Sequence, residues 1–356
     1  MLTPASPEFE ALLRQRRPVT DDETKRSVER TIADVREKGD QAVREAARLF
    51  DAPTLERVVA RSSEWEKAVV PAELEKAIEL ATDRILAFHD HQYEALFGSW
   101  RVHEPIAMRL AHGHRIWRLG ADFKPDAIGQ RVRPVERAGV YAPGGRAIYP
   151  SSVLMNALPA VGAMVPRYVI ATPARPDGTL APALGRAVRA VSEAGGWAKE
   201  VTAIKVGGAA AIAAMALGTE TVPRCDVVVG PGNRWVNEAK RQLWGECGFD
   251  GYAGPSEVCV LIDASTNPTL AAADLLTQIE HAPDNVGFLV GTDENVLKSI
   301  EAELFRMIAA SPRREILETS SRNGATILAR DEKEACDAVN RIAPEHLTIA
   351  TRDPER

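Results

Sequence analysis

One stretch of sequence decides the fold of this chain: Cys225-Asp226-Val227-Val228-Val229-Gly230-Pro231-Gly232-Asn233. Its apolar first half predicts a strand, and the glycines on either side of Pro231 predict a tight turn. Asn233 is a candidate N-cap for a helix that runs through Arg241. Such a turn lets backbone N–H groups approach a phosphate or carboxylate closely. A tight turn without a ligand is the other interpretation, because Trp235 stands where a full dinucleotide fingerprint has its third glycine.

Strands and helices alternate on both sides of this stretch. Each expected strand is a short apolar run followed by a turn and a helical stretch: 168–172, 201–206, 225–229, 259–263, 288–291 and 326–329. Alternation of this kind with apolar strands predicts parallel sheets that are covered by helices on both faces. We therefore expect an α/β fold with two Rossmann-like parallel-sheet domains.

The region from Thr20 to about His91 has a helical pattern instead. Its apolar residues recur at spacings near 3.6 in three runs: Val28, Ile32 and Val35; Val43, Ala46 and Leu49; and Leu74, Ile78, Leu80, Ile85 and Phe88. The pattern changes to strands from Arg137 onward. The sequence therefore predicts a helical N-terminal region.

Composition fits a globular protein and excludes some functions. The 356 residues suffice for two domains at about 150 residues each, and 45% hydrophobic with 26% charged residues is ordinary. A net charge of −6 argues against nucleic-acid binding, which needs basic excess. No apolar run approaches the roughly 18 residues of a membrane span, and we find no signal-peptide pattern. We therefore expect neither nucleic-acid nor membrane partners.

Cysteine usage indicates the compartment. The four cysteines are scattered without a CxxC spacing: Cys225, Cys247, Cys259 and Cys336. They are interpreted as buried thiols in a reducing compartment, so we expect a cytoplasmic protein.

Two short segments hold the histidines best suited to chemistry. Gln278 and His281 are spaced i,i+3 at the end of an expected helix, so both side chains should project from one face and could form half of a metal site. Asn267 is the candidate N-cap of that helix, Pro268 its first residue, and Pro283 stops the run. A solvated helix end is the alternative interpretation.

The second segment is Ala343-Pro344-Glu345-His346-Leu347. Glu345 and His346 could both accept protons near neutral pH once burial tunes them. Neighbours on a regular strand face opposite ways, so the pair should lie in a loop or at a strand start after Pro344. A solvated loop pair is the alternative.

Several blocks, in this order and spacing, resemble the histidinol dehydrogenase family. They are Ala138–Gly145, Tyr149–Asn156, Val206–Ala213, Val229–Asn233 and Ala253–Val258, together with the two histidine segments. The resemblance runs from about Val19 to the end of the chain. It implies a zinc- and NAD-dependent enzyme that oxidises L-histidinol via L-histidinal to L-histidine, the last steps of histidine biosynthesis.

The resemblance also implies roles for individual residues. Tyr141 and Asn233 match residues that contact NAD. Substrate would bind at Ser256, Gln278, His281 and His346, and the metal at Gln278 and His281. Glu345 and His346 would be catalytic: His346 takes the alcohol proton, and Glu345 then activates water for attack on the aldehyde.

The family's layout implies two domains and two subunits. Residues 1–136 and 256–356 would form a discontinuous α/β catalytic domain with a helical N-terminus. Residues 137–255 would form an inserted Rossmann-like NAD-binding domain. The implied assembly is a homodimer.

The chain departs from the family pattern at three places. Ala210 stands where a glutamine is common, which removes a hydrogen bond typically worth about 0.5–1.5 kcal/mol. Met164 stands where a glycine is usual. The family also continues beyond the Glu-His pair with a tail that supplies two more zinc ligands, an aspartate and a histidine, and a substrate-binding glutamate. We expect a fragment of a complete enzyme, with an inactive natural truncation as the alternative.

Other enzyme classes stay open on the sequence alone. A related dehydrogenase acting on another amino- or hydroxy-alcohol is the second choice. An aldehyde dehydrogenase with a cysteine nucleophile is disfavoured, because no cysteine lies in an evident activating loop.

Overall fold

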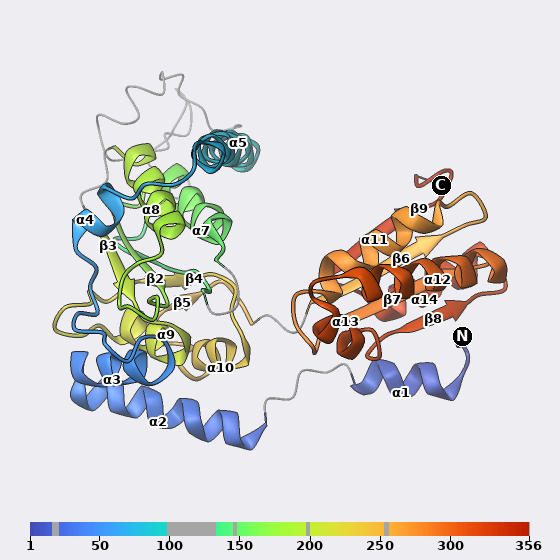
Figure 1. The fold of residues 1–356 in the computed structure, drawn as a ribbon, viewed down its shortest axis with the longest axis horizontal. Helices are drawn as coiled ribbons and strands as arrows, with labels where there is room; N and C mark the ends of the chain where they lie inside the picture. Colours follow the sequence, from blue (N-terminus) through green and yellow to red (C-terminus); the bar gives the residue numbers. More distant parts are fainter. Residues whose placement is uncertain (16–20, 98–132, 145–147, 197–199, 253–255, 356) are drawn as a thin grey trace, which may run out of the picture. The chain divides into compact units, whose positions relative to one another are not determined.

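Two sheets of parallel strands organise the chain, one built from residues between 138 and 249 and the other from residues between 257 and 350 (Figure 1). The computed structural model describes residues 1–15, 21–97, 133–144, 148–196, 200–252 and 256–355. The chain splits into two units: Met1–Val19 with Gly254–Arg356 form unit 1, and Thr20–Ala253 form unit 2. Each unit is described by itself below.

The sheet of unit 2 has five parallel strands in the order β3-β2-β1-β4-β5. The strands are β1 (Ala138–Tyr141), β2 (Arg167–Thr172), β3 (Glu200–Lys205), β4 (Val227–Val229) and β5 (Gly248–Phe249). This is the strand order of a Rossmann fold. The expected strands near 168–172, 201–206 and 225–229 are therefore confirmed, and so is the fold class.

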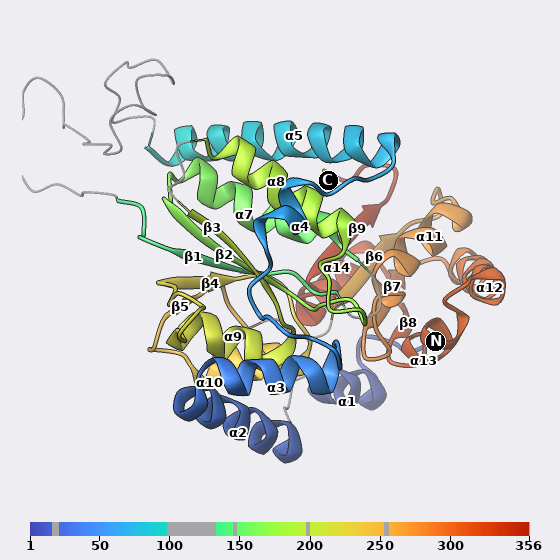
Figure 2. The same ribbon diagram turned by 60° about the vertical axis from the view of Figure 1, so that its left-hand side comes forward.

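Helices cover both faces of this sheet, as Figure 2 shows. One face packs against α7 (Pro150–Gly162) and α8 (Pro182–Ala194), and the other against α9 (Gly208–Leu217) and α10 (Arg234–Gln242). Strands β1 to β4 carry buried apolar side chains, and Phe249 of β5 is partly buried, as expected for strands that are covered on both faces.

The N-terminal helices form outer layers on the same unit. They are α2 (Asp22–Lys38), α3 (Asp40–Phe50), α4 (Ser62–Glu66) and α5 (Ala72–Phe97). Helices α2 and α3 pack beside α9, and α4 and α5 beside α8. Val28, Ile32 and Val35 are buried as their spacing predicts. Leu49 is instead 74% exposed, because it lies about 240° around α3 from the buried Val43.

The division between units differs from the expected one. Residues 1–136 were expected to join 256–356, but the described helices between 22 and 97 all belong to unit 2. Of the described residues before 137, only residues 1–15 belong to unit 1. The reason is that an apolar helical stripe shows which face is buried, not which sheet layer it covers.

Unit 1 has a four-stranded parallel sheet in the order β8-β7-β6-β9. The strands are β6 (Glu257–Ile262), β7 (Val286–Gly291), β8 (Ala325–Leu328) and β9 (His346–Ala350). One face packs against α11 (Pro268–Ile279), α12 (Glu294–Ala310) and α13 (Arg314–Ser320), and the other against α1 (Pro7–Gln15) and α14 (Glu332–Ile342). The expected strands near 259–263, 288–291 and 326–329 are confirmed. Among the described residues, no helix is both long and apolar enough to span a membrane.

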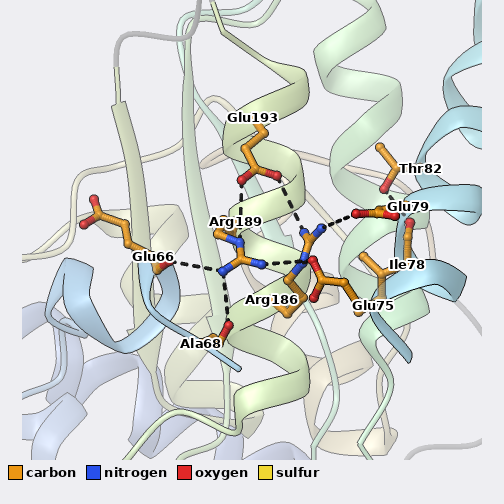
Figure 3. Close-up of polar contacts among 9 residues, drawn as sticks. All are labelled: Glu66, Ala68, Glu75, Ile78, Glu79, Thr82, Arg186, Arg189 and Glu193. Carbon is orange, nitrogen blue, oxygen red and sulfur yellow. Dashed lines mark hydrogen bonds and ion pairs between the residues drawn. The ribbon is translucent and has the colours of Figure 1, made fainter. Parts of the chain in front are cut away.

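Two arginines of α8 bind the outer helical layer of unit 2 to the inner one (Figure 3). The Arg186 side chain is 4% exposed, and its Nε donates to Glu75 Oε1 of α5 at 2.5 Å, while Glu79 and Glu193 lie within 4 Å of its other nitrogens. Arg189 donates to the backbone carbonyls of Glu66 and Ala68, at 3.3 and 3.1 Å. A buried guanidinium of this kind needs all its carboxylates to offset its lost hydration.

Arg186→Ala should therefore weaken unit 2 strongly. We expect the free energy of unfolding to fall by about 3 kcal/mol, because the change removes a buried cation from the partly buried Glu75, which among the described residues then keeps only its longer contact with Arg189 at 3.1 Å. Urea unfolding followed by tryptophan fluorescence measures this in unit 2, since all six tryptophans lie between residues 65 and 244. The matched control is Arg36→Ala, which breaks an exposed pair with Glu246 at 2.9 Å and should cost about 0.5 kcal/mol. Equal losses in the two variants would contradict this role for Arg186.

Two described residues other than glycine have a left-handed backbone. Met164, where the family usually has glycine, has φ +63°, and Ala343, the C-cap of α14, has φ +45° and ψ +59°. The left-handed region costs a residue with a Cβ roughly 1–2 kcal/mol. Ala343 directly precedes Pro344 and Glu345, so this backbone turn aims the chain into β9.

Ala343→Gly should stabilise unit 1 by about 0.5–1 kcal/mol. Glycine removes the strain of the Cβ in the left-handed region. It also raises the entropy of the unfolded chain, which offsets part of the gain in stability. Urea unfolding followed by circular dichroism measures the change. Ala302→Gly, at an exposed position inside α12, is the control and should lose about 1 kcal/mol. A loss at Ala343 equal to that at Ala302 would show that the backbone there is not strained.

Candidate functional site

The candidate cofactor residues of unit 2 gather at the carboxyl edge of its sheet. Tyr141 is the last residue of β1, and the Gly230–Gly232 turn follows the neighbouring strand β4. Strand order reverses between β1 and β4, and open α/β sheets bind their ligands at such a switch point. The structure thus places Tyr141 and Asn233 on adjacent strand ends.

Gly230 allows the two strand ends to approach closely. Its φ is +126°, and a Cβ at this position would lie 2.1 Å from the carbonyl oxygen of Tyr141. Only glycine fits there. Asn233 is the N-cap of α10 as expected, and its Oδ1 accepts the N–H groups of Trp235 and Val236, both at 3.2 Å.

The Gly230 turn is held by an ion pair that the sequence reading missed. The N–H of Gly230 donates to Asp250 Oδ2 at 2.8 Å, and its carbonyl accepts from Lys240 Nζ at 2.6 Å. Lys240 is buried and also donates to Asp250 Oδ1 at 2.7 Å. The Gly230 N–H is therefore not free for an anion, contrary to our expectation. The signal was present, because a dinucleotide fingerprint also has an acidic residue about 20 positions on.

The second turn, between β3 and α9, is also held by side chains. The N–H of Gly207 donates to Asp51 Oδ2 at 2.9 Å, and the N–H of Gly208 donates to the Tyr141 hydroxyl at 3.1 Å. Burial raises the pKa of Tyr141 to about 12, so its phenol stays protonated at neutral pH. Tyr141 thus joins the end of β1 to the start of α9.

Open space lies in front of this second turn. Gly208 has φ +62°, and a Cβ built on it would meet no atom within 4 Å. Within the described part of the chain, the N–H groups of Ala209 and Ala210 in the first turn of α9 have no partner. An open helix N-terminus at a switch-point edge suits a dinucleotide phosphate or ribose. The residues present therefore fit NAD.

The candidate catalytic residues of unit 1 gather at the amino edge of its sheet. Ser256 directly precedes β6, and His346 begins β9, where it pairs with Val258. Helix α11 returns antiparallel to these strands, so its last turn with Gln278 lies at the same amino edge. The sequence-predicted residues of this unit are therefore brought to one edge of the sheet.

Asn285, which the sequence reading did not single out, holds this edge together. It is buried, its Oδ1 accepts the N–H of Ser256 at 3.1 Å, and its Nδ2 donates to the Gln278 carbonyl at 2.7 Å. Asn323 in turn donates to the carbonyls of Pro283 and Asn285. Only its place between Pro283 and an apolar run, where a turn is expected, gave a hint of this role.

The two histidine segments differ in how well they were predicted. Asn267 caps α11 and Pro268 begins it, but α11 ends at Ile279, so His281 lies beyond the helix rather than on its face. One further turn keeps it close, since its N–H donates to the Gln278 carbonyl at 3.1 Å. His346 begins β9 and Glu345 directly precedes it, as expected for a pair at a strand start; Glu345 Oε1 and His346 Nε2 are 3.9 Å apart, and both side chains are about half exposed.

The described residues do not complete a zinc shell. Gln278 and His281 offer two donors from adjoining turns, whereas zinc in proteins takes at least three. In the described part of the chain, no group of three His, Cys, Asp or Glu side chains could hold a metal ion. No chemical step is therefore assigned to a metal below.

The cysteines do not support a thiolate nucleophile. Burial raises the pKa of the Cys225 thiol and raises that of Cys247 to about 11, so both stay protonated at neutral pH. Cys225 and Cys259 are buried, whereas Cys247 is partly buried and Cys336 is exposed, contrary to the expectation that all four are buried.

Comparison with known proteins covers both units. The histidinol dehydrogenase family model matches residues 14–356. The chain is 41% identical over 353 residues to histidinol dehydrogenase of Zymomonas mobilis, covering 98% of this chain and 75% of that protein. It is 39% identical over 343 residues to that of Pseudomonas aeruginosa, covering 95% and 71%.

A solved structure agrees with the sequence matches. The crystal structure of histidinol dehydrogenase from Elizabethkingia anophelis superimposes with a TM-score of 0.80 at 30% identity, covering 100% of this chain and 76% of that one. The chain thus spans about three quarters of the length of these relatives. Because the match includes both sheets and nearly every residue, the chain belongs to the histidinol dehydrogenase family of oxidoreductases.

Proposed function

We propose that this protein oxidises L-histidinol via L-histidinal to L-histidine, with NAD as the hydride acceptor in both steps. Membership of the family supports the reaction. The observation that carries the assignment of residues is the amino edge of the unit 1 sheet. There His346 begins β9, directly after Glu345, beside the strand that Ser256 precedes.

His346 would take the proton of the alcohol in the first step. Its imidazole is half exposed, so substrate can reach it, and a neutral imidazole accepts a proton near physiological pH. Glu345 would activate water for attack on the aldehyde in the second step. The 3.9 Å between Glu345 Oε1 and His346 Nε2 allows the carboxylate to stabilise the imidazolium that forms first.

Gln278, His281 and Ser256 would bind substrate at the same edge. Asn285 fixes the backbone of Ser256 and Gln278 through its two amide atoms, so these residues keep their positions without substrate. As a proposal from the resemblance, Gln278 and His281 would also give two donors to a zinc ion. Such an ion would hold and orient the substrate.

Tyr141 and Asn233 would bind NAD in unit 2. The support is the open helix N-terminus at Gly208 next to the Tyr141 hydroxyl, at the switch point of a Rossmann-type sheet. NAD would accept the hydride in each step. A homodimer is proposed from the resemblance alone, and a cytoplasmic location from the scattered cysteines.

Substitutions of the acid–base pair test the proposal. His346→Asn should slow oxidation of histidinol about 10²–10⁴-fold while NAD binding persists, because one positioned base is lost. Glu345→Gln should impair oxidation of histidinal more than that of histidinol. Single-turnover formation of NADH with each substrate separates the two steps.

Other results would count against these roles. Small and equal effects of both substitutions on both steps would indicate a solvated pair without catalytic function. If the protein oxidised another amino-alcohol in preference to histidinol, the proposed dehydrogenase activity would stand, but the proposed substrate would be wrong. Glu332→Gln, at an exposed position in the first turn of α14, is a control that should leave both steps unchanged.

A further inference from the structure

The Asp51 carboxylate lies at the carboxyl edge of the unit 2 sheet, where the candidate cofactor residues gather. Asp51 itself is the C-cap residue of helix α3. Its Oδ2 accepts the Gly207 N–H at 2.9 Å, so it stands directly after β3. A Cβ built on Gly207 would lie 2.7 Å from the Pro173 ring and 3.3 Å from the Asp51 carboxylate. Pro173 is the first residue after β2. Asp51 therefore stands beside the carboxyl ends of two adjacent strands, β2 and β3.

That position has a known use in Rossmann-type sheets. An acidic residue near the end of the second strand binds the ribose hydroxyls of NAD, and an arginine there accommodates the 2′-phosphate of NADP. In this chain β2 is followed by Pro173, Ala174 and Arg175, so the strand brings no carboxylate of its own. The next acidic residue, Asp177, is exposed and accepts from the N–H and hydroxyl of Thr179.

The charge of Asp51 is not explained by the fold. Burial raises its pKa, and within the described residues no lysine, arginine or histidine nitrogen lies within 4.0 Å of its carboxylate. A carboxyl group whose pKa is higher in the folded than in the unfolded state stabilises the fold at low pH. This contribution is lost as the pH rises through the folded-state pKa. The ionised form thus weakens the fold, whereas Asp250 at the other glycine turn is paired with Lys240. A neutral acceptor would hold the Gly207 N–H equally well.

We propose that Asp51 determines cofactor specificity, by accepting hydrogen bonds from the adenosine ribose hydroxyls of NAD and repelling the 2′-phosphate of NADP. The inference rests on the proposed binding of NAD at this edge. Asp51 supplies from outside the Rossmann unit the carboxylate that β2 lacks. One of its oxygens holds the turn, and the described part of the chain offers the other no hydrogen-bond donor, so that oxygen can accept from a hydroxyl.

The first experiment measures binding of NAD and NADP by calorimetry, without turnover. Asp51→Asn keeps an acceptor for the Gly207 N–H and removes the charge. We expect the ratio of NADP to NAD affinity to rise at least about 10-fold, because a like charge next to a phosphate is removed. Asp83→Asn, at an exposed position of α5, is the control and should leave the ratio unchanged. An unchanged ratio in Asp51→Asn, or an equal shift in Asp83→Asn, would overturn the proposal.

The second experiment needs no variant and so does not depend on Asp51→Asn folding. The unaltered protein should bind an NAD analogue that lacks the adenosine 2′-hydroxyl about 10-fold or more weakly than NAD, because a hydrogen bond to a charged acceptor is lost. Equal affinity for the two would overturn the proposal while leaving NAD binding intact. Failure to bind either NAD or NADP would instead overturn the proposed cofactor, and this inference with it.

Discussion

The approach of Gly230 to the Tyr141 carbonyl is the constraint on which the cofactor edge depends. With 2.1 Å left for a Cβ, no side chain fits, and the chain leaves β4 against the end of β1. The same contact puts Tyr141 where its hydroxyl reaches the Gly208 N–H at 3.1 Å. One backbone contact thus fixes two glycine turns. The buried pair Lys240 and Asp250 then holds both backbone polar groups of Gly230.

The two sheets present their candidate residues at opposite edges. In unit 2 these residues follow the strands, where backbone N–H groups at helix starts suit an anionic cofactor. In unit 1 they precede the strands, where helix C-termini gather and carbonyl dipoles favour cations. A site at that edge suits a substrate with amino and imidazole groups, such as histidinol. The two units have sheets of the same type, but the different chemistry of these edges suits one to an anionic cofactor and the other to a cationic substrate.

Local features were predictable from the sequence, and distant pairings were not. The caps Asn233 and Asn267 and the strand start at His346 depend on neighbouring residues and matched expectation. His281 was misplaced because a helix end is set by its last hydrogen bonds rather than by spacing. Asp51 was missed because it lies 156 residues from Gly207, and nothing in its own segment marks it. The contacts of the N-terminal helices with α8 and α9 of unit 2 were not foreseen for a similar reason.

Electrostatics separates the structural carboxylates of unit 2 from the one we assign to specificity. Glu64 illustrates the structural kind: it accepts from Lys205 Nζ and from the N–H groups of Arg61 and Leu180, which hold its pKa below the usual range against an opposing effect of burial. Every lone-pair direction has a donor, and the charge is neutralised. Among the described residues Asp51 has one backbone donor, and its pKa is raised. A partly buried charge that these residues leave unbalanced is most simply explained by a ligand that supplies the missing donors.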